Sequence, residues 1–308
     1  MILDESVWRA RAAAHEARVD ALVAPHLERR SAHVKHPVHD FLFTYYAQRP
    51  AQLRRWHPGF GVRLADAPEY DGLRGYDAGG VAPAYVETQR PLLTALRRLL
   101  AATAGRPAHT GCFGLHEWAM VYRLGADGQD PRHDWPLRLG GAGTDAVVES
   151  HRIACSHFDA FRFFTPPARP LNTLSPGPGD RDGFEQPGCL HAGMDLYKHA
   201  FRLSPMIASE LVGDAFELAW DIRVLDMRAA PYDFTGVTLD HTGEPWSPVR
   251  IETPEGKQQY VAAQRGFALR GEAVRSSLID ECDRLLRAVD DAAEPAAPAR
   301  SGHQPTRS

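Results

Sequence analysis

The stretch PMIASELVGDAFELAWDIRVLDMR, residues 205–228, predicts one long helix. At about 100° per residue, apolar side chains cover most of its circumference and four acids form one narrow stripe. A helix that is apolar over most of its surface packs against other helices in a core. The stretch therefore predicts a mainly α-helical fold, with the stripe facing solvent; a carboxylate metal cluster along the stripe is the alternative. The stripe consists of Glu210, Asp214, Glu217 and Asp221.

One acid of this helix departs from the stripe. Asp226 lies within the apolar face, and Arg223 precedes it by about one turn. A carboxylate directed toward a core needs a partner, and such groups concentrate at functional sites. Asp226 and Arg223 are therefore either a structural ion pair or part of a functional site.

Apolar residues at helical spacing predict three more helices, over residues 5–24, 88–104 and 272–291. We expect Pro25 to break or kink the first of them, because proline lacks a backbone N–H and clashes with the preceding turn. The glycine run at 140–143 lies between short alternating apolar stretches, which predicts an antiparallel hairpin.

A second hairpin is predicted within residues 236–261, with residues 254–257 as its turn. The alanine- and proline-rich end of the chain, residues 291–308, is expected to be a disordered tail. The sequence as a whole predicts a mainly α-helical single domain over residues 1–290, with one or two small antiparallel β hairpins.

The composition is that of an ordinary globular protein. The 308 residues are 44% hydrophobic and 24% charged, with a net charge of −4 when histidines are neutral. This balance lacks the global basic excess of most nucleic-acid binders and leaves only a local basic face for such contacts. No CxxC pair occurs among the four cysteines, which excludes a zinc ribbon or finger. No apolar run of membrane-spanning or signal-peptide type occurs, so we expect a cytoplasmic protein without a membrane partner.

Side chains that could take part in catalysis or ligand binding concentrate in ESHRIACSHFDAFRFF, residues 149–164. This stretch holds two histidines, a cysteine, two acids and four phenylalanines. Buried polar atoms cost free energy unless they are paired, so their density within an aromatic run indicates a functional site. We expect a strand that ends near Cys155 and a helix that starts with a capping box of Ser156 and Asp159.

Three segments supply histidines close to acids. The first contains His116 and Glu117, the second covers residues 151–159, and the third places His191 and Lys198 on one helical face. Two histidines and an acid from separate segments suit zinc or iron, whereas hydrogen-bonded structural histidines are the alternative. No HExxH, GxGxxG, GxxxxGK[ST] or GxSxG motif occurs, so neither a zincin, a nucleotide loop nor a hydrolase elbow is indicated. The predicted metal set is His151, His157, His191 and Asp195.

A basic stretch near the N-terminus has two interpretations. Arg49, Arg54 and Arg55 adjoin Trp56 and could together form a surface for phosphate or base contacts. A solvated helix end with a buried tryptophan is the simpler interpretation, since charge runs usually face solvent.

Several segments together resemble a group of actinobacterial proteins that carry the name 3-methyladenine DNA glycosylase. The resemblance covers about residues 5 to 275 and implies removal of alkylated purines from DNA, with the damaged base flipped into an aromatic pocket. The chain lacks the glycine-rich hairpin and following aspartate of helix-hairpin-helix glycosylases, so none of their motif residues is transferred. The segments are HPVHDFLFTYYAQRPAQLRRWHPG (36–59), GLHEWAMVYRLG (114–125), RIACSHFDAFRFFTP (152–166), EQPGCLHAGMDLYKHA (185–200) and LDMRAAPYD (225–233).

A glycosylase needs an aromatic slot and a carboxylate that stabilises positive charge on the sugar. Asp226 is the first candidate for that carboxylate and Asp159 the second, with His157 as a further catalytic candidate. DNA is the partner under this hypothesis, and no cofactor is needed. The candidate substrate-binding residues are Trp135, Phe158, Phe161, Phe163, Phe164 and Arg223.

Two other classes of function stay open. The histidine segments suit a metal-dependent enzyme that acts on a small molecule or nucleotide with zinc or iron. A non-catalytic binding module, in which the polar groups are structural, is the third hypothesis.

Overall fold

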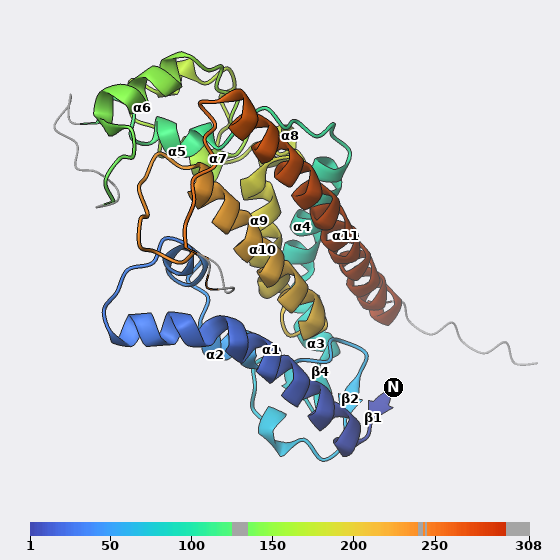
Figure 1. Ribbon diagram of the computed structural model, residues 1–308. Coiled ribbons are helices and arrows are strands. Elements are labelled where there is room, and N and C mark those ends of the chain that lie inside the picture. The colour runs from blue at the N-terminus through green and yellow to red at the C-terminus, as the bar shows by residue number, and fades with distance from the viewer. Residues whose placement is uncertain (125–134, 240–242, 244, 294–308) are drawn as a thin grey trace, which may run out of the picture.

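The computed structural model describes residues 1–124, 135–239, 243 and 245–293, and its fold is mainly α-helical, as the sequence predicts (Figure 1). Short turns of other helix types are η1 (Phe41–Tyr45), η2 (Pro68–Tyr70) and η3 (Arg169–Leu171). The α-helices are α1 (Glu5–Ser31), α2 (Pro50–Arg54), α3 (Pro83–Thr88), α4 (Arg90–Ala104), α5 (Leu115–Ala119), α6 (Gly140–Glu149), α7 (Phe158–Phe161), α8 (Arg181–Phe184), α9 (Leu190–Leu203), α10 (Ser209–Ala229) and α11 (Pro254–Ala293).

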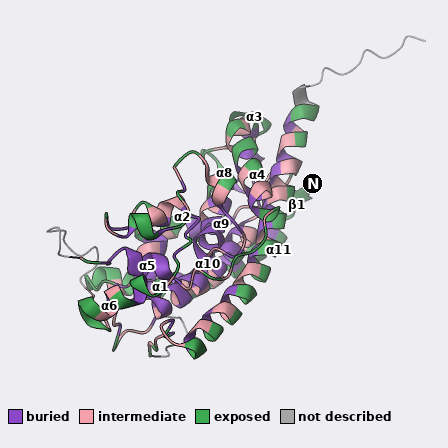
Figure 2. Ribbon diagram, turned by 90° about the horizontal axis from the view of Figure 1, so that it is seen from above, coloured by how far each residue is buried: buried purple, intermediate pink, exposed green. Residues whose placement is uncertain are grey.

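Helices α9 and α10 form the centre of the molecule, with α11 and α4 packed beside them (Figure 1). Figure 2 shows most of α9 and α10 as buried, whereas buried and exposed residues alternate along α11. A Cβ at Gly193 of α9 would lie 2.8 Å from Ile222 Cδ1 of α10, so glycine permits the close approach of these helices. The long helix predicted over residues 205–228 is α10, and it lies in the core.

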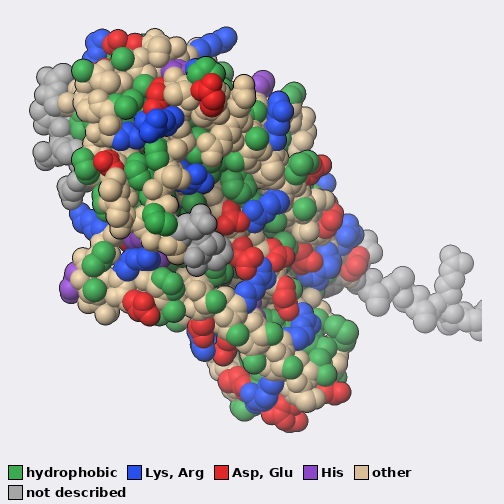
Figure 3. Space-filling view, in the orientation of Figure 1, with side chains coloured by type: hydrophobic (Ala, Val, Ile, Leu, Met, Phe, Trp, Pro, Cys, Tyr) green, Lys and Arg blue, Asp and Glu red, His purple; other side chains and the backbone are tan. Residues whose placement is uncertain are grey.

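The acid stripe of α10 lies at the surface, where its members form ion pairs with arginines of α1 and α11. Figure 3 shows acidic and basic side chains interleaved in this region. Exposed ion pairs of this kind contribute about 0–1 kcal/mol each, so they orient α1 on α10 more than they stabilise the fold. The pairs are Arg11–Glu210 at 2.6 Å, Arg18–Asp214 at 2.8 Å, Arg18–Glu217 at 2.6 Å and Arg270–Asp221 at 2.8 Å.

A small sheet lies beside the start of α1. Its strands are β1 (Ile2–Leu3), β2 (Arg63–Leu64), β3 (Tyr76–Asp77) and β4 (Gly80–Val81), in the order β1-β2-β4-β3. The β1–β2 pair is parallel and the other pairs are antiparallel. No helix in the described part of the chain has the length and apolar character to cross a membrane.

The hairpin predicted around residues 140–143 is wrong, because this region forms α6. Thr144, Val147 and Val148 are the buried residues of this helix, and their spacing of three and four is helical. The expected strand before Cys155 is reduced to a single bridge between Ile153 and Asn172. The capping box is also absent, since His157 is the first residue before α7 and no side chain caps the helix.

The second predicted hairpin turn is wrong as well, because residues 254–257 begin α11. Proline is favoured in the first turn of a helix, where its missing N–H has no intrahelical acceptor. Helix α1 continues past Pro25, and the ring of His26 stacks on Phe43 with centroids 4.3 Å apart, which holds the last turns in place. Of the predicted tail, residues 291–293 belong to α11 and the rest lies outside the described residues.

Candidate functional site

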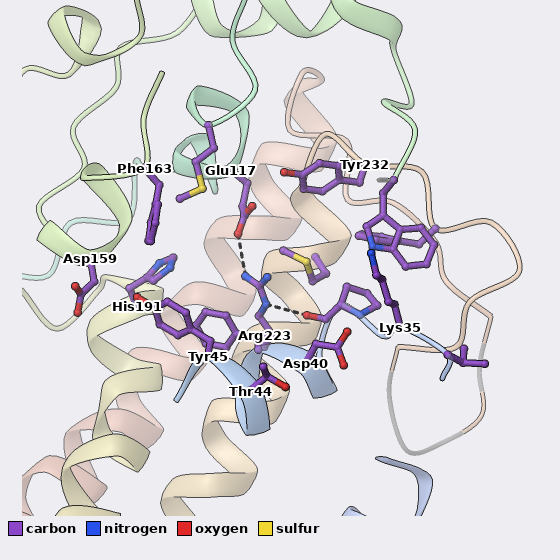
Figure 4. A pocket seen from close by; sticks show the side chains of 17 residues that line it. Lys35, Asp40, Thr44, Tyr45, Glu117, Asp159, Phe163, His191, Arg223 and Tyr232 are labelled. Carbon is purple, nitrogen blue, oxygen red and sulfur yellow. Dashed lines mark hydrogen bonds and ion pairs between the residues drawn. The ribbon is translucent and has the colours of Figure 1, made fainter. Parts of the chain in front are cut away.

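A cavity of about 700 Å³ lies between η1, the start of α9 and the end of α10. Figure 4 shows Glu117 and Arg223 in its middle, between His191 and Phe163 on one side and Tyr232 on the other. Small-molecule sites have this composition, with apolar walls and few convergent polar groups. The aromatic lining consists of Phe41, Tyr45, Trp135, Phe163, Tyr232 and Phe234, and the ionisable lining includes Lys35, Asp40, Glu117, Asp159, His191 and Arg223.

A buried group of polar residues, which we call the Asp226 centre, adjoins this cavity. His116 Nε2 lies 2.9 Å from Asp226 Oδ1. Arg223 Nη1 donates to Asp226 Oδ2 at 2.6 Å and to Glu117 Oε1 at 2.9 Å. The rings of His116 and His191 are in edge contact, with centroids 4.4 Å apart. Segments from α5, α9 and α10 therefore meet at one point.

A second buried group, the Asp195 centre, touches the first. His157 Nε2 lies 3.4 Å from both Glu185 Oε1 and Asp195 Oδ2. Arg181 donates to Asp195 Oδ2 at 2.5 Å and also to Glu185. The rings of His157 and His191 have centroids 5.3 Å apart, so histidine contacts join the two centres. The Asp195 centre consists of His157, Arg181, Glu185, Asp195 and Lys198.

The local backbone directs these side chains inward. Phe113 and Gly114 have φ angles of +45° and +71°, and α5 begins at the next residue. Glycine adopts this left-handed conformation readily, whereas phenylalanine does so rarely, so the turn is specified by its surroundings. Every residue of α5 is buried, and in α10 the spacing of three places Arg223 and Asp226 on one face.

The two centres hold more buried acid than buried base. Four buried carboxylates face the guanidinium groups of Arg223 and Arg181 and the half-buried ammonium group of Lys198. A buried carboxylate without a compensating charge is costly, so the region needs one more positive charge, on a histidine or on a bound cation. The carboxylates belong to Glu117, Glu185, Asp195 and Asp226.

The pKa values of the two histidines beside Asp226 shift in opposite directions. Burial alone would lower the pKa of His116, but the charge of Asp226 and their hydrogen bond outweigh it and raise this pKa. Burial, together with the charge of His116, holds the pKa of His191 well below its ordinary value. No residue that the structure describes hydrogen-bonds to a ring nitrogen of His191. Such a neutral imidazole can ligate a metal or accept a proton.

Two sets of three residues have the geometry to hold a metal ion. In each set the ligand atoms all lie within 4.8 Å of one another, and histidine with carboxylate suits zinc or iron. Cations contact a carboxylate in both sets, since Arg223 pairs with Asp226 whereas Arg181 and Lys198 pair with Asp195. The first set has a histidine without a hydrogen-bond partner at the cavity and is the better candidate. The sets are His116, His191 and Asp226, and His157, Glu185 and Asp195.

The residues predicted to bind one metal ion lie at different places in the structure. His157 and Asp195 lie in the Asp195 centre and His191 lies in the Asp226 centre. His151 belongs to neither set, because its Nδ1 lies 2.6 Å from the carbonyl oxygen of Val147 at the end of α6. The structure therefore divides three of the four predicted residues between two centres and leaves His151 outside both, since the strand expected to carry His151 toward the others is reduced to a single bridge.

The predicted aromatic slot is only partly present. Trp135 and Phe163 line the cavity, whereas Phe158, Phe161 and Phe164 do not. Helix α7 has four residues, too few to present the expected face, and Phe161 instead packs on the buried Phe164 with ring centroids 5.2 Å apart. Arg223, also predicted to bind substrate, does line the cavity.

The predicted catalytic acids occupy different environments. Asp226 is 0% exposed, is fully paired and does not line the cavity. Asp159 lines the cavity and lies 3.3 Å from both Lys198 and Arg162. His157 is buried, and its Nδ1 has no hydrogen-bond partner among the described residues.

Glu117 is a carboxylate of the cavity wall with one oxygen that pairs with no residue the structure describes. Its side chain is about 4% exposed, and Oε2 has no hydrogen-bond partner among the described residues, while Arg223 holds the other oxygen. Such an oxygen can accept a proton or an N–H group from a ligand. Among the remaining members of the site, Arg181 begins α8 and Glu185 directly follows it, and no spacing in the sequence marks either as a site residue.

Comparison of the chain with protein-family models, with curated proteins and with solved structures gives no match.

Proposed function

We propose that the protein is a metal-dependent enzyme that acts on a small planar organic molecule bound in the aromatic cavity. His116, His191 and Asp226 are the proposed metal ligands. The observation that carries the proposal is the state of His191. Its ring nitrogens hydrogen-bond to no described residue, and the ring lines the cavity and contacts His116, which pairs with Asp226. Burial also holds the pKa of His191 well below its ordinary value. A bound divalent ion would also supply the positive charge that the buried acids need.

The groups around this site suit hydrolysis. A metal ion in such a site supplies Lewis acidity toward a substrate oxygen or a water molecule. Arg223 fixes both Glu117 and Asp226, and Glu117 Oε2 is placed to accept the proton of an attacking water as a general base. The aromatic walls hold the planar body of the substrate and exclude bulk water.

Elemental mass spectrometry of the natively purified protein tests this proposal. We expect about one zinc or iron ion per chain. The His191→Ala protein should hold at least about tenfold less metal, since one of three ligands is lost. His151→Ala is the matched control, because His151 is hydrogen-bonded to the backbone outside both centres, and its metal content should not change. Wild-type protein that holds no ion, and takes up none from added zinc or ferrous iron, contradicts the proposal.

A second candidate function is the excision of alkylated purines from DNA, which the resemblance to the 3-methyladenine glycosylase group favours. The structural observation in its favour is the cavity, since a volume of about 700 Å³ and aromatic walls suit a base flipped out of a duplex. Glu117 or Asp159 would face that base, because Asp226 does not line the cavity.

Release of free base from alkylated duplex DNA tests this second candidate. We expect release that persists after chelation and falls by about 10²–10⁴ in Glu117→Gln, which loses a carboxylate at the reacting centre. Asp40→Asn is a useful control, since Asp40 lines the same cavity but accepts a hydrogen bond from the His36 backbone. Wild-type protein that releases no base removes this candidate and leaves the metal-dependent enzyme.

A further inference from the structure

A second hollow, of about 560 Å³, lies next to the cavity. Turn η1 contributes to both, with Phe41 and Tyr45 in the cavity and Phe43 in the second hollow. Figure 4 shows Asp40 and Thr44 at the edge of the cavity, close to η1. A ligand could therefore occupy both spaces at once. The residues that line both are Val34, Lys35, Asp40 and Thr44.

Positive charge dominates this second hollow, which we call the basic pocket. Four cationic side chains line it against one acid, Asp40, although the whole chain has a net charge of −4. Burial lowers the pKa of His36 to about 4 and also lowers that of His26, so these two lining histidines are neutral at pH 7. The excess charge therefore comes from guanidinium and ammonium groups. The cations are Arg29, Arg30, Lys35 and Arg49.

Several polar groups of the basic pocket lack partners. The side chains of Arg30 and Arg49 form no ion pair or hydrogen bond with a described residue, whereas those of most other described arginines do. Gln48 is 5% exposed, and its Oε1 is buried without a hydrogen-bond partner. Its amide nitrogen also bonds to no described residue. An anion in the pocket could accept hydrogen bonds from both guanidinium groups and from the amide nitrogen of Gln48.

We infer that the basic pocket binds a phosphate group of the substrate, whose planar body occupies the adjoining cavity. The inference rests on the proposed function in that the cavity is taken as the active site. Arginine forks match phosphate oxygens, and the aromatic walls match a heterocyclic ring. The substrate class is thus a phosphate ester of a planar heterocyclic compound, as in a nucleotide. The phosphate belongs either to a free mononucleotide or to a nucleic-acid strand.

Titration calorimetry with inorganic phosphate tests the pocket itself. We expect binding to the wild type and at least about tenfold weaker binding to the Arg30→Gln/Arg49→Gln protein, because two charged donors are removed. Arg55→Gln is the matched control, since Arg55 is also an exposed arginine but lies outside the basic pocket. Phosphate that does not bind the wild type, or binds all three proteins equally, overturns the inference.

Two further probes identify the source of the phosphate. Adenosine monophosphate that binds more tightly than both adenosine and a short single-stranded oligodeoxynucleotide supports a free nucleotide. An oligodeoxynucleotide that binds more tightly than adenosine monophosphate supports a strand. If neither binds more tightly than inorganic phosphate, the assignment of a nucleotide-type substrate fails. His191→Ala should lose metal and keep its phosphate affinity, because His191 does not line the basic pocket. Wild-type protein that binds phosphate but neither holds nor takes up a metal ion rejects the proposed function and leaves the basic pocket in place.

Discussion

Replacement of Asp226 by Asn should lower the free energy of unfolding of the chelator-treated protein by about 3–5 kcal/mol. The carboxylate is 0% exposed and pairs with both His116 and Arg223. An amide in its place leaves the Arg223 charge with Glu117 alone and one of the amide's own groups unsatisfied. Urea unfolding at pH 7, followed by circular dichroism, measures this loss. Removal of metal beforehand separates the ion pair from any contribution of a bound ion.

Asp221→Asn is the matched control for this substitution. Asp221 lies on the same helix but pairs with Arg270 at the surface, where both side chains are more than one third exposed. Its loss should cost at most about 1 kcal/mol. Equal losses in the free energy of unfolding for the two substitutions would show that burial does not determine how much the Asp226 ion pair stabilises the protein.

Part of this centre could be predicted from the sequence because it lies within one helix. The period of α10 placed Asp226 and Arg223 on the apolar face, and their separation of three residues allows the ion pair that the structure contains. The other members come from α5 and α9, and no spacing rule relates residues more than a hundred positions apart, such as His116 and Asp226. Sequence patterns therefore named Glu117 and His191 as candidates but not as neighbours.

The errors arose where short patterns were ambiguous. A few alternating apolar residues and a glycine run suit a hairpin as well as a short helix, and only the packing of Val147 and Val148 against the core selects the helix α6. Pro254 suits both a β-turn and the first turn of a helix, because proline is favoured in both. In each case tertiary contacts that the local sequence does not encode decided the outcome.

Replacement of Arg181 by Met should also destabilise the protein by about 3–5 kcal/mol at pH 7. Methionine fills most of the volume of the side chain but removes the cation that contacts both Asp195 and Glu185. Both carboxylates are almost fully buried, so neither can be solvated by water instead. Lys198 and the hydroxyl group of Tyr46 still contact Asp195, whereas Glu185 keeps only His157. Urea unfolding again measures the effect.

The pH dependence of this loss identifies its cause. Burial would raise the pKa of Asp195, but the hydrogen bond from His157 and the charges of His157 and Lys198 hold it well below its ordinary value. A carboxyl group with a lowered pKa in the folded state stabilises the fold above its unfolded pKa of about 4, and this stability is lost as the pH falls further. The difference in the free energy of unfolding between wild type and Arg181→Met should therefore be largest at pH 7 and become smaller below about pH 4. Arg162→Met, which breaks the partly exposed pair with Asp159 and an exposed hydrogen bond to the Tyr45 hydroxyl group, should cost about 1 kcal/mol at either pH. A loss in Arg181→Met that does not change with pH would mean that packing of the side chain, and not its charge, stabilises the Asp195 centre.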